Sequence, residues 1–290
     1  MKISVSSYSF SQYILEGKLT QLSAIAAAKE IGLEAIEFTD LTPPKGITDE
    51  KYAAEIKAEA DRLGMIINAY TVGANLYQPT PEAEAAMISA LKRKVDVAAI
   101  LGTKVLRHDL CWRLTPTGTG RSFDLMLPTI ARCAREITEY AAQFGIRTCS
   151  ENHGYVAQDS TRMERLVNAV AHDNYGLLVD MGNFACADED SAMAVSRVAP
   201  YAFHAHAKDF SKRSFAEGPA RGYFQTRACN WLKGEAIGEG DIPIKQCMAI
   251  LKRAGYDGYL SIEYEGSGDC IEGIRTGFQN LKKYLAELEG

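Results

Sequence analysis

The sequence predicts a single-domain α/β protein, a (β/α)8 TIM barrel that spans residues 1–290. Strand-like runs alternate with helical patterns eight times, which indicates parallel strands joined by helices. A length of 290 residues suits this closed barrel, and no stretch of the sequence has the composition of a linker. The first strand-to-helix turn, Ser6-Ser7-Tyr8-Ser9, lacks the glycines of an open dinucleotide-binding sheet.

In the first half of the chain, glycines placed directly after helical patterns define the helix ends. Gly32, Gly64, Gly102 and Gly145 each follow such a pattern, and Pro81 opens one of them. The expected strands are Lys2–Ser7, Ala35–Phe38, Met65–Tyr70 and Lys104–Arg107. The expected helices are Leu19–Ile31, Asp49–Leu63, Pro81–Leu101 and Ser122–Phe144.

In the second half, four strand-like runs carry or end in a polar side chain that can bind a metal: Glu151, Asp180, His206 and Glu263. The last of these runs is Gly258–Tyr264. The expected helices are Ser160–Ala171, a segment around Asp188–Val198, Ile242–Ala254 and Ile271–Leu288. Between Asp209 and about Gly240 the chain is polar and rich in glycine, so we expect a long loop that acts as a lid.

The composition restricts the classes of partner. A net charge of -5 and a pI near 5.7 argue against a nucleic-acid partner, which usually requires a basic face. No apolar run is long enough to cross a membrane, and the N-terminal residues enter a strand without a signal peptide. The seven cysteines are scattered and form no CxxC pair, which predicts reduced thiols in a cytoplasmic protein.

The four strand-end residues predict one metal site. Functional groups of such barrels lie at the C-terminal ends of the strands, and these four strands follow one another. Any single carboxylate here has roughly an even chance of being solvated or structural, so only the ordered set favours a site. Three carboxylates and one imidazole suit one divalent cation, with Mn²⁺ favoured and Mg²⁺, Co²⁺ or Zn²⁺ left open.

Further side chains near the predicted barrel mouth are candidates for substrate binding. His108 and His153 follow strands four and five, and Trp112 lies in a loop where its ring could stack on a sugar or pack a lid. Lys208 shares a strand face with His206 because side chains alternate along a strand, although it could instead pair with Asp209. His204 shares that face as well, and a supporting hydrogen bond is its expected role.

The ordered set of motifs resembles the xylose isomerase-like TIM barrels, in particular the sugar phosphate isomerase/epimerase group. The resemblance spans essentially the whole chain. Its strongest features are Ser150-Glu151-Asn152-His153-Gly154, Val179-Asp180-Met181-Gly182-Asn183-Phe184, His206-Ala207-Lys208-Asp209, and the C-terminal run from Gly238 to Gly266. The individual motifs are not unique to this family, whereas their order is specific to it.

The resemblance implies roles for the strand-end residues. In the ketose 3-epimerases of this family, the equivalent Glu-Asp-His-Glu set binds one divalent metal and the two glutamates move protons. Carried over, Glu151, Asp180, His206 and Glu263 would bind the metal, and Glu151 and Glu263 would form the acid/base pair.

This chain also departs from the epimerase pattern. Asn183 stands where those enzymes have a histidine, and Ala157 stands where they have a second glutamate. Lys212 or Arg213 matches their basic residue only loosely, so Asn183, Lys212 and Arg213 join the candidate substrate-binding residues. These changes leave the substrate open, and with it the reaction.

The leading hypothesis is a metal-dependent isomerase or epimerase that acts on a small carbohydrate through an enediolate. The main alternative is a lyase of the inosose dehydratase or C-glycoside deglycosidase kind, in which His153 or His108 protonates the leaving group. A remote alternative is DNA repair like that of endonuclease IV, for which five histidines are few. A metal-free binding module is a further alternative. Relatives commonly form dimers or tetramers, and the sequence leaves the oligomeric state of this chain open.

Overall fold

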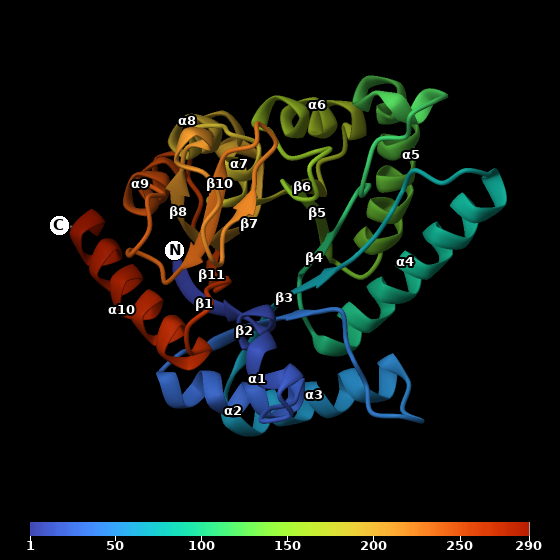
Figure 1. Cartoon of the computed structure of the whole chain (residues 1–290). Helices are drawn as coiled ribbons and strands as arrows, with labels where there is room; N and C mark the ends of the chain where they lie inside the picture. Colours follow the sequence, from blue (N-terminus) through green and yellow to red (C-terminus); the bar gives the residue numbers. More distant parts are fainter. Residues whose placement is uncertain (290) are drawn as a thin grey trace.

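The computed structural model describes residues 1–289, and across these residues eight parallel strands close into one barrel (Figure 1). The order around the barrel is β1-β11-β7-β6-β5-β4-β3-β2, so β1 pairs with both β11 and β2. The strands are β1 (Lys2–Ser6), β2 (Ala35–Thr39), β3 (Ile66–Val72), β4 (Val105–His108), β5 (Arg147–Glu151), β6 (Tyr175–Asp180), β7 (Ala202–Ala207) and β11 (Tyr259–Ile262). The predicted fold class is confirmed.

A helix follows each barrel strand and covers the outside of the barrel. These helices are α2 (Gln21–Ile31), α3 (Asp49–Leu63), α4 (Pro81–Leu101), α5 (Phe123–Ala142), α6 (Ser160–Val170), α8 (Ser191–Val198), α9 (Ile244–Arg253) and α10 (Cys270–Glu289). Side-chain caps fix several starts: Thr20 and Thr48, for example, each accept a hydrogen bond from the backbone N–H three residues on. The cap at Thr20 explains why α2 begins at Gln21 instead of the predicted Leu19.

The first strand leads into a short 3-10 turn (Ser7–Phe10) and α1 (Ser11–Leu15), which the sequence did not signal. A second short helix, α7 (Asn183–Cys186), follows β6. The predicted helix around Asp188–Val198 is shorter and begins at Ser191, where the side chain of Asp190 caps it. None of the helices in residues 1–289 has the length and apolar character needed to span a membrane.

On strands β3 to β6 the barrel interior is apolar below the strand ends, whereas on β1, β7 and β11 it is polar there as well, with Ser4, His204 and Ser261 joined by hydrogen bonds. Ala69, Val105, Cys149 and Leu178 form a separate small cluster of buried apolar residues. Val105 and Cys149 lie two residues before Arg107 and Glu151, so the same inward faces become charged toward the strand ends. The larger apolar core lies between the barrel and its helices.

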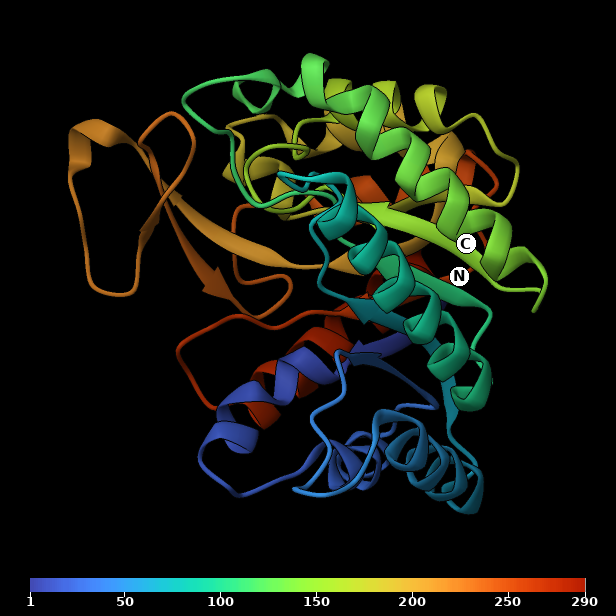
Figure 2. The ribbon, with the colours of Figure 1, turned by 90° about the vertical axis from the view of Figure 1, so that its right-hand side faces the viewer.

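The segment that we expected to be a loop between Asp209 and Gly240 contains a three-stranded antiparallel sheet. Its strands are β8 (Asp209–Arg213), β9 (Phe224–Gln225) and β10 (Trp231–Glu235), in the order β8-β10-β9. This sheet, orange in Figure 2, extends away from the barrel. Phe210 and Leu232 are the apolar residues that the two long strands bury, so the alternating pattern is too weak to be recognised in the sequence.

Candidate active site

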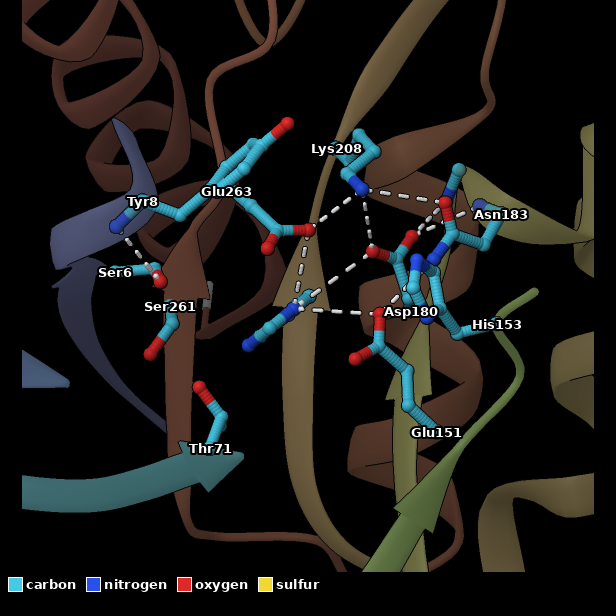
Figure 3. Close-up of polar contacts among 12 residues, drawn as sticks. Ser6, Tyr8, Thr71, Glu151, His153, Asp180, Asn183, Lys208, Ser261 and Glu263 are labelled. Atoms are coloured by element: carbon cyan, nitrogen blue, oxygen red, sulfur yellow. Dashed lines mark hydrogen bonds and ion pairs between the residues drawn. The ribbon is translucent and has the colours of Figure 1, made fainter. Parts of the chain in front are cut away.

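Glu151, Asp180, His206 and Glu263 meet at the C-terminal ends of β5, β6, β7 and β11, which are neighbours in the barrel. Figure 3 shows the carboxylates of Glu151, Asp180 and Glu263 directed toward one centre. One oxygen or nitrogen from each side chain lies within 4.8 Å of the corresponding atom of the other three. His206 Nδ1 is 3.8 Å from Glu151 Oε1, 3.7 Å from Asp180 Oδ2 and 3.3 Å from Glu263 Oε2. All four side chains are buried.

Asp180 has one oxygen fixed by the backbone and one directed at the cluster. Its Oδ1 accepts hydrogen bonds from the N–H groups of Gly182 and Asn183, both at 2.8 Å. This tight turn needs glycine, because a Cβ on Gly182 would lie 2.6 Å from the carbonyl oxygen of Lys208. The turn therefore leaves Oδ2 free for the centre of the site.

His206 is oriented by Glu37, a fully buried carboxylate on β2. His206 Nε2 donates to Glu37 Oε1 and Oε2, both at 3.0 Å, and His204 Nε2 donates to Glu37 Oε2 at 2.5 Å. Burial alone would lower the pKa of His206, but the charge of Glu37 outweighs it and raises the pKa well above its ordinary value. With Nε2 bound in this way, Nδ1 faces the cluster.

Glu37 is a residue that the sequence did not single out. Its only signal was a carboxylate near the end of a predicted strand, which is the rule that identified the four cluster residues. The supporting role expected for His204 agrees with its contact to Glu37.

Glu151 is held through both of its carboxylate oxygens. Arg107 Nη2 donates to Oε2, and Asn183 Nδ2 donates to Oε1 at 2.9 Å. Arg107 also pairs with Asp109 Oδ1 at 3.1 Å and donates to the carbonyl oxygen of Val72 at 3.2 Å. Burial would lower the pKa of Arg107, but Asp109 and Glu151 raise it, so the guanidinium stays charged.

Glu263 has a different cationic partner, Lys208, which is also buried. Lys208 Nζ lies 2.6 Å from Glu263 Oε2, 3.5 Å from Asp180 Oδ2 and 3.5 Å from Glu265 Oε2. Burial would raise the pKa of Glu263, but Lys208 and His206 lower it well below its ordinary value. Lys208 also donates to Asn183 Oδ1 at 3.2 Å, which links the partners of the two glutamates.

A cavity of about 320 Å³ opens above the cluster. Its lining residues are Tyr8, Thr39, Asp40, Thr71, Gly73, Arg107, Asp109, Trp112, Glu151, His153, Lys208, Glu263 and Glu265. His153 Nδ1 lies 3.2 Å from Asp109 Oδ1. Burial would lower the pKa of His153, but this hydrogen bond raises it. The rings of Trp112 and His153 lie edge to face with their centroids 6.4 Å apart, so two rings line the cavity beside the polar cluster.

The structure divides the other predicted substrate-binding residues into two groups. Trp112, His153 and Lys208 line the cavity, and Asn183 contacts both Glu151 and Lys208. His108 is fully buried outside the cavity, because strand alternation turns its neighbour Arg107 inward.

Lys212 and Arg213 lie elsewhere, although the sequence suggested that they join the substrate site. They lie on β8 and line a separate cavity of about 430 Å³ together with Trp231. The reason is the antiparallel sheet: β8 leads the chain away from the cluster, toward β10.

The four cluster residues fit a divalent metal ion. Asp180 Oδ2 and His206 Nδ1 are buried without a hydrogen-bond partner within residues 1–289. Glu263 Oε2 also lacks a well-formed hydrogen bond there, although Lys208 Nζ is close to it. Buried polar atoms without partners are costly, and these point at one another. Three carboxylates and an imidazole are a donor set that hard and borderline divalent cations accept.

The fold and the cluster together define a (β/α)8 barrel with a potential metal site at the C-terminal ends of its strands. Residues 25–284 match the model of the xylose isomerase-like TIM barrel family, and the chain belongs to this family. A comparison of the sequence with curated proteins gives no match.

Solved structures support the same fold. D-psicose 3-epimerase from Clostridium cellulolyticum H10, solved with D-tagatose, has a TM-score of 0.76 and 16% identity over 98% of this chain and 99% of that one. A xylose isomerase-like TIM barrel protein from Mycobacterium smegmatis, in complex with magnesium, has a TM-score of 0.75 and 16% identity over 100% of this chain and 98% of that one. The probable 3-DHS dehydratase AsbF from Bacillus anthracis has a TM-score of 0.73 and 16% identity over 97% of this chain and 99% of that one.

Proposed function

We propose that this protein is a metal-dependent isomerase or epimerase of a small carbohydrate or carbohydrate derivative, which works through an enediolate. The observation that carries the proposal is the convergence of Glu151, Asp180, His206 and Glu263 below an open cavity. The similarity to D-psicose 3-epimerase adds support at the level of the fold.

In this proposal the four cluster residues hold one divalent ion, with Mn²⁺ favoured and Mg²⁺, Co²⁺ or Zn²⁺ as alternatives. Such an ion supplies Lewis acidity that polarises a carbonyl group and stabilises the negative charge that develops when the neighbouring carbon loses a proton. Glu37 fixes the ring of His206, and the turn at Gly182 fixes Asp180, so the ligand atoms need little rearrangement.

The chain's own residues would carry the proton transfers. Glu263, as a carboxylate, would remove the proton next to the carbonyl. Glu151, after taking up a proton from solvent, would return it on the opposite face, which inverts that carbon, and Glu263 would then release its proton to solvent. Lys208 lowers the pKa of Glu263, so this carboxylate is charged before the substrate binds, and Arg107 holds Glu151 in place by an ion pair. Trp112 and Tyr8 line the cavity with aromatic rings that would contact the C–H side of the substrate, and Thr39 and Thr71 line the same cavity with hydroxyl groups.

The test is an NMR assay of the Mn²⁺-loaded protein in D₂O with a panel of ketoses and cyclic polyol ketones. Incorporation of solvent deuterium at a carbon that keeps its hydroxyl group supports the proposal. Glu263→Gln should abolish most of this exchange and retain the metal. Near-normal exchange by that variant, or wild-type activity in protein stripped of metal, would refute the assignment.

A second candidate function is a lyase that expels a hydroxyl group from the same type of intermediate. The observation in its favour is the His153–Asp109 pair, which places an imidazole on the cavity wall where it could protonate a leaving group. The same NMR assay distinguishes the two reactions, because a lyase yields a dehydrated product.

A further inference from the structure

We propose that the substrate of this site is uncharged: a polyhydroxylated carbonyl compound without a phosphate or carboxylate group. The inference rests on the proposed function, since it concerns what the same cavity accepts. Three observations support it. They are the partners of the cavity's cations, the balance of charge in the cavity, and the protein side chains that accept hydrogen bonds from the backbone N–H groups after β7 and β11.

The two permanent cations that line the cavity are already paired with buried carboxylates. Arg107 donates to Glu151 and lies 3.1 Å from Asp109, and Lys208 lies 2.6 Å from Glu263. An anionic substrate would have to displace one of these carboxylates and leave it buried without its partner. Losing a partner in a buried ion pair is strongly unfavourable, so neither cation is a ready anion site.

Carboxylates outnumber cations on the cavity wall. The wall contains five carboxylates, Asp40, Asp109, Glu151, Glu263 and Glu265, against Arg107, Lys208 and the imidazole of His153. Asp40 is itself paired with Lys94, which lies outside the cavity lining, at 3.0 Å. A divalent ion ligated by three carboxylates does not reverse this balance, because its own ligands already exceed its charge. The cavity therefore repels a negative charge on the substrate. This repulsion acts at short range, where solvent screens charges little.

Barrels of this type often bind phosphate in the loops after strands seven and eight. After β7, the backbone N–H groups gather around a carboxylate of the protein itself, Asp209. Asp209 accepts hydrogen bonds from Phe210 N at 2.9 Å, Gly238 N at 2.8 Å, Gly240 N at 3.1 Å and Ile242 N at 3.0 Å. The fit is close, since a Cβ on Gly240 would lie 2.3 Å from Asp209 Oδ1. These N–H groups are therefore already satisfied and are not available to a phosphate.

After β11, the N-terminal end of α10 is occupied in the same way. Gln12 Oε1 accepts a hydrogen bond from Cys270 N at 3.0 Å, and Asp269 Oδ1 accepts one from Glu272 N at 3.1 Å. Tyr13 fixes Asp269 by donating to its other oxygen at 2.5 Å. A helix N-terminus attracts anions through such N–H groups, and here the protein's own side chains already satisfy them.

Isothermal titration calorimetry of the Mn²⁺-loaded full chain tests the inference with matched ligands. The probes are D-fructose, D-tagatose and an inosose, compared with fructose 6-phosphate, tagatose 6-phosphate and 5-keto-D-gluconate. A phosphate at C6 leaves the C1–C3 region of the ketose unchanged, so the comparison changes the charge and size of the far end only. We expect a neutral compound to bind at least about tenfold more tightly than its anionic counterpart.

Tighter binding of a phosphate or carboxylate than of its neutral counterpart would overturn the inference and leave the proposed function standing. Binding of Mn²⁺ without binding of any carbohydrate, neutral or anionic, would overturn both.

Glu265→Gln sharpens the test, because it removes one charge from the cavity wall and keeps the size of the side chain. Affinity for the phosphorylated ketoses should rise by about tenfold at low salt, and affinity for the neutral ones should change much less. Glu30→Gln is the control, because Glu30 is exposed on α2, and it should change neither affinity. An equal change for both ligand classes, or no rise for the phosphates, would contradict charge as the cause.

Discussion

Glu151 and Glu263 face the same centre from the two ends of the arc β5-β6-β7-β11, but their surroundings differ. Glu151 is 2% exposed, and hydrogen bonds from Arg107 and Asn183 occupy both of its oxygens. Glu263 is 7% exposed and pairs with Lys208, a point charge on a flexible stem. A planar guanidinium fixes the orientation of its partner, whereas an ammonium group mainly fixes its charge.

Two glutamates of one candidate metal site therefore need not be equivalent. The restraint on Glu151 suits a ligand whose position must not change. The greater exposure of Glu263 suits the carboxylate that first contacts the substrate proton.

The largest expected effect is on turnover in Glu263→Gln. Loss of a positioned proton-transfer group should lower the rate of deuterium exchange on the order of 10² to 10⁴-fold. Mn²⁺ binding, measured by calorimetry, should persist, because the amide oxygen can still face the metal. Glu151→Gln should instead lower both the Mn²⁺ affinity and the exchange rate. The reason is that its neutral amide would face the donor groups of Arg107 and lose the ion pair that fixes the side chain. Identical metal affinities in the two variants would remove the proposed distinction.

Arg107→Met should strongly destabilise the metal-free protein. It leaves the carboxylates of Glu151 and Asp109 buried without their cation, which costs about 3–5 kcal/mol of unfolding free energy. Urea denaturation followed by circular dichroism in EDTA measures the loss. Arg62→Met is the control, because Arg62 is exposed and its pair with Glu59 should contribute no more than about 1 kcal/mol. A loss for Arg107→Met as small as the control's would mean that the ion pairs of Arg107 with Glu151 and Asp109 do not stabilise the fold.

Glu37→Gln should weaken Mn²⁺ binding by about 10- to 100-fold, because Glu37 orients His206, the ligand that lies between the two glutamates. Competition with a metal-sensitive dye gives the affinity. Glu34→Gln, an exposed position just before the same strand, is the matched control. An unchanged affinity in Glu37→Gln would show that the barrel alone holds the imidazole in place.

Lys208→Met should have the smallest effect, and its sign is opposite. Lys208 Nζ lies within 3.5 Å of the carboxylate oxygens of Asp180 and Glu263, so the ammonium repels a divalent ion there. Removing it should raise Mn²⁺ affinity by about tenfold at low ionic strength. Lys45→Met, an exposed loop position, provides the control for calorimetry. Weaker Mn²⁺ binding in Lys208→Met would mean that the lysine organises the carboxylates more than it competes with the metal.

The sequence also has a clear limit in the region after β7. Polar strands with one buried apolar side chain each produce no strong periodic pattern, so β8 and β10 were expected to be loop. That error moved Lys212 and Arg213 toward the substrate in the prediction, while the antiparallel pairing places them beside Trp231.

The sequence by itself determined the barrel and the convergence of Glu151, Asp180, His206 and Glu263. It could do so because parallel strands bring their C-terminal ends to one edge, so local patterns are enough. Only the tertiary structure decided the partners of these residues. Glu37 reaches His206 across 169 positions, and Arg107 reaches Glu151 across 44. Such contacts depend on barrel closure, strand register and burial, which no local pattern in the chain encodes.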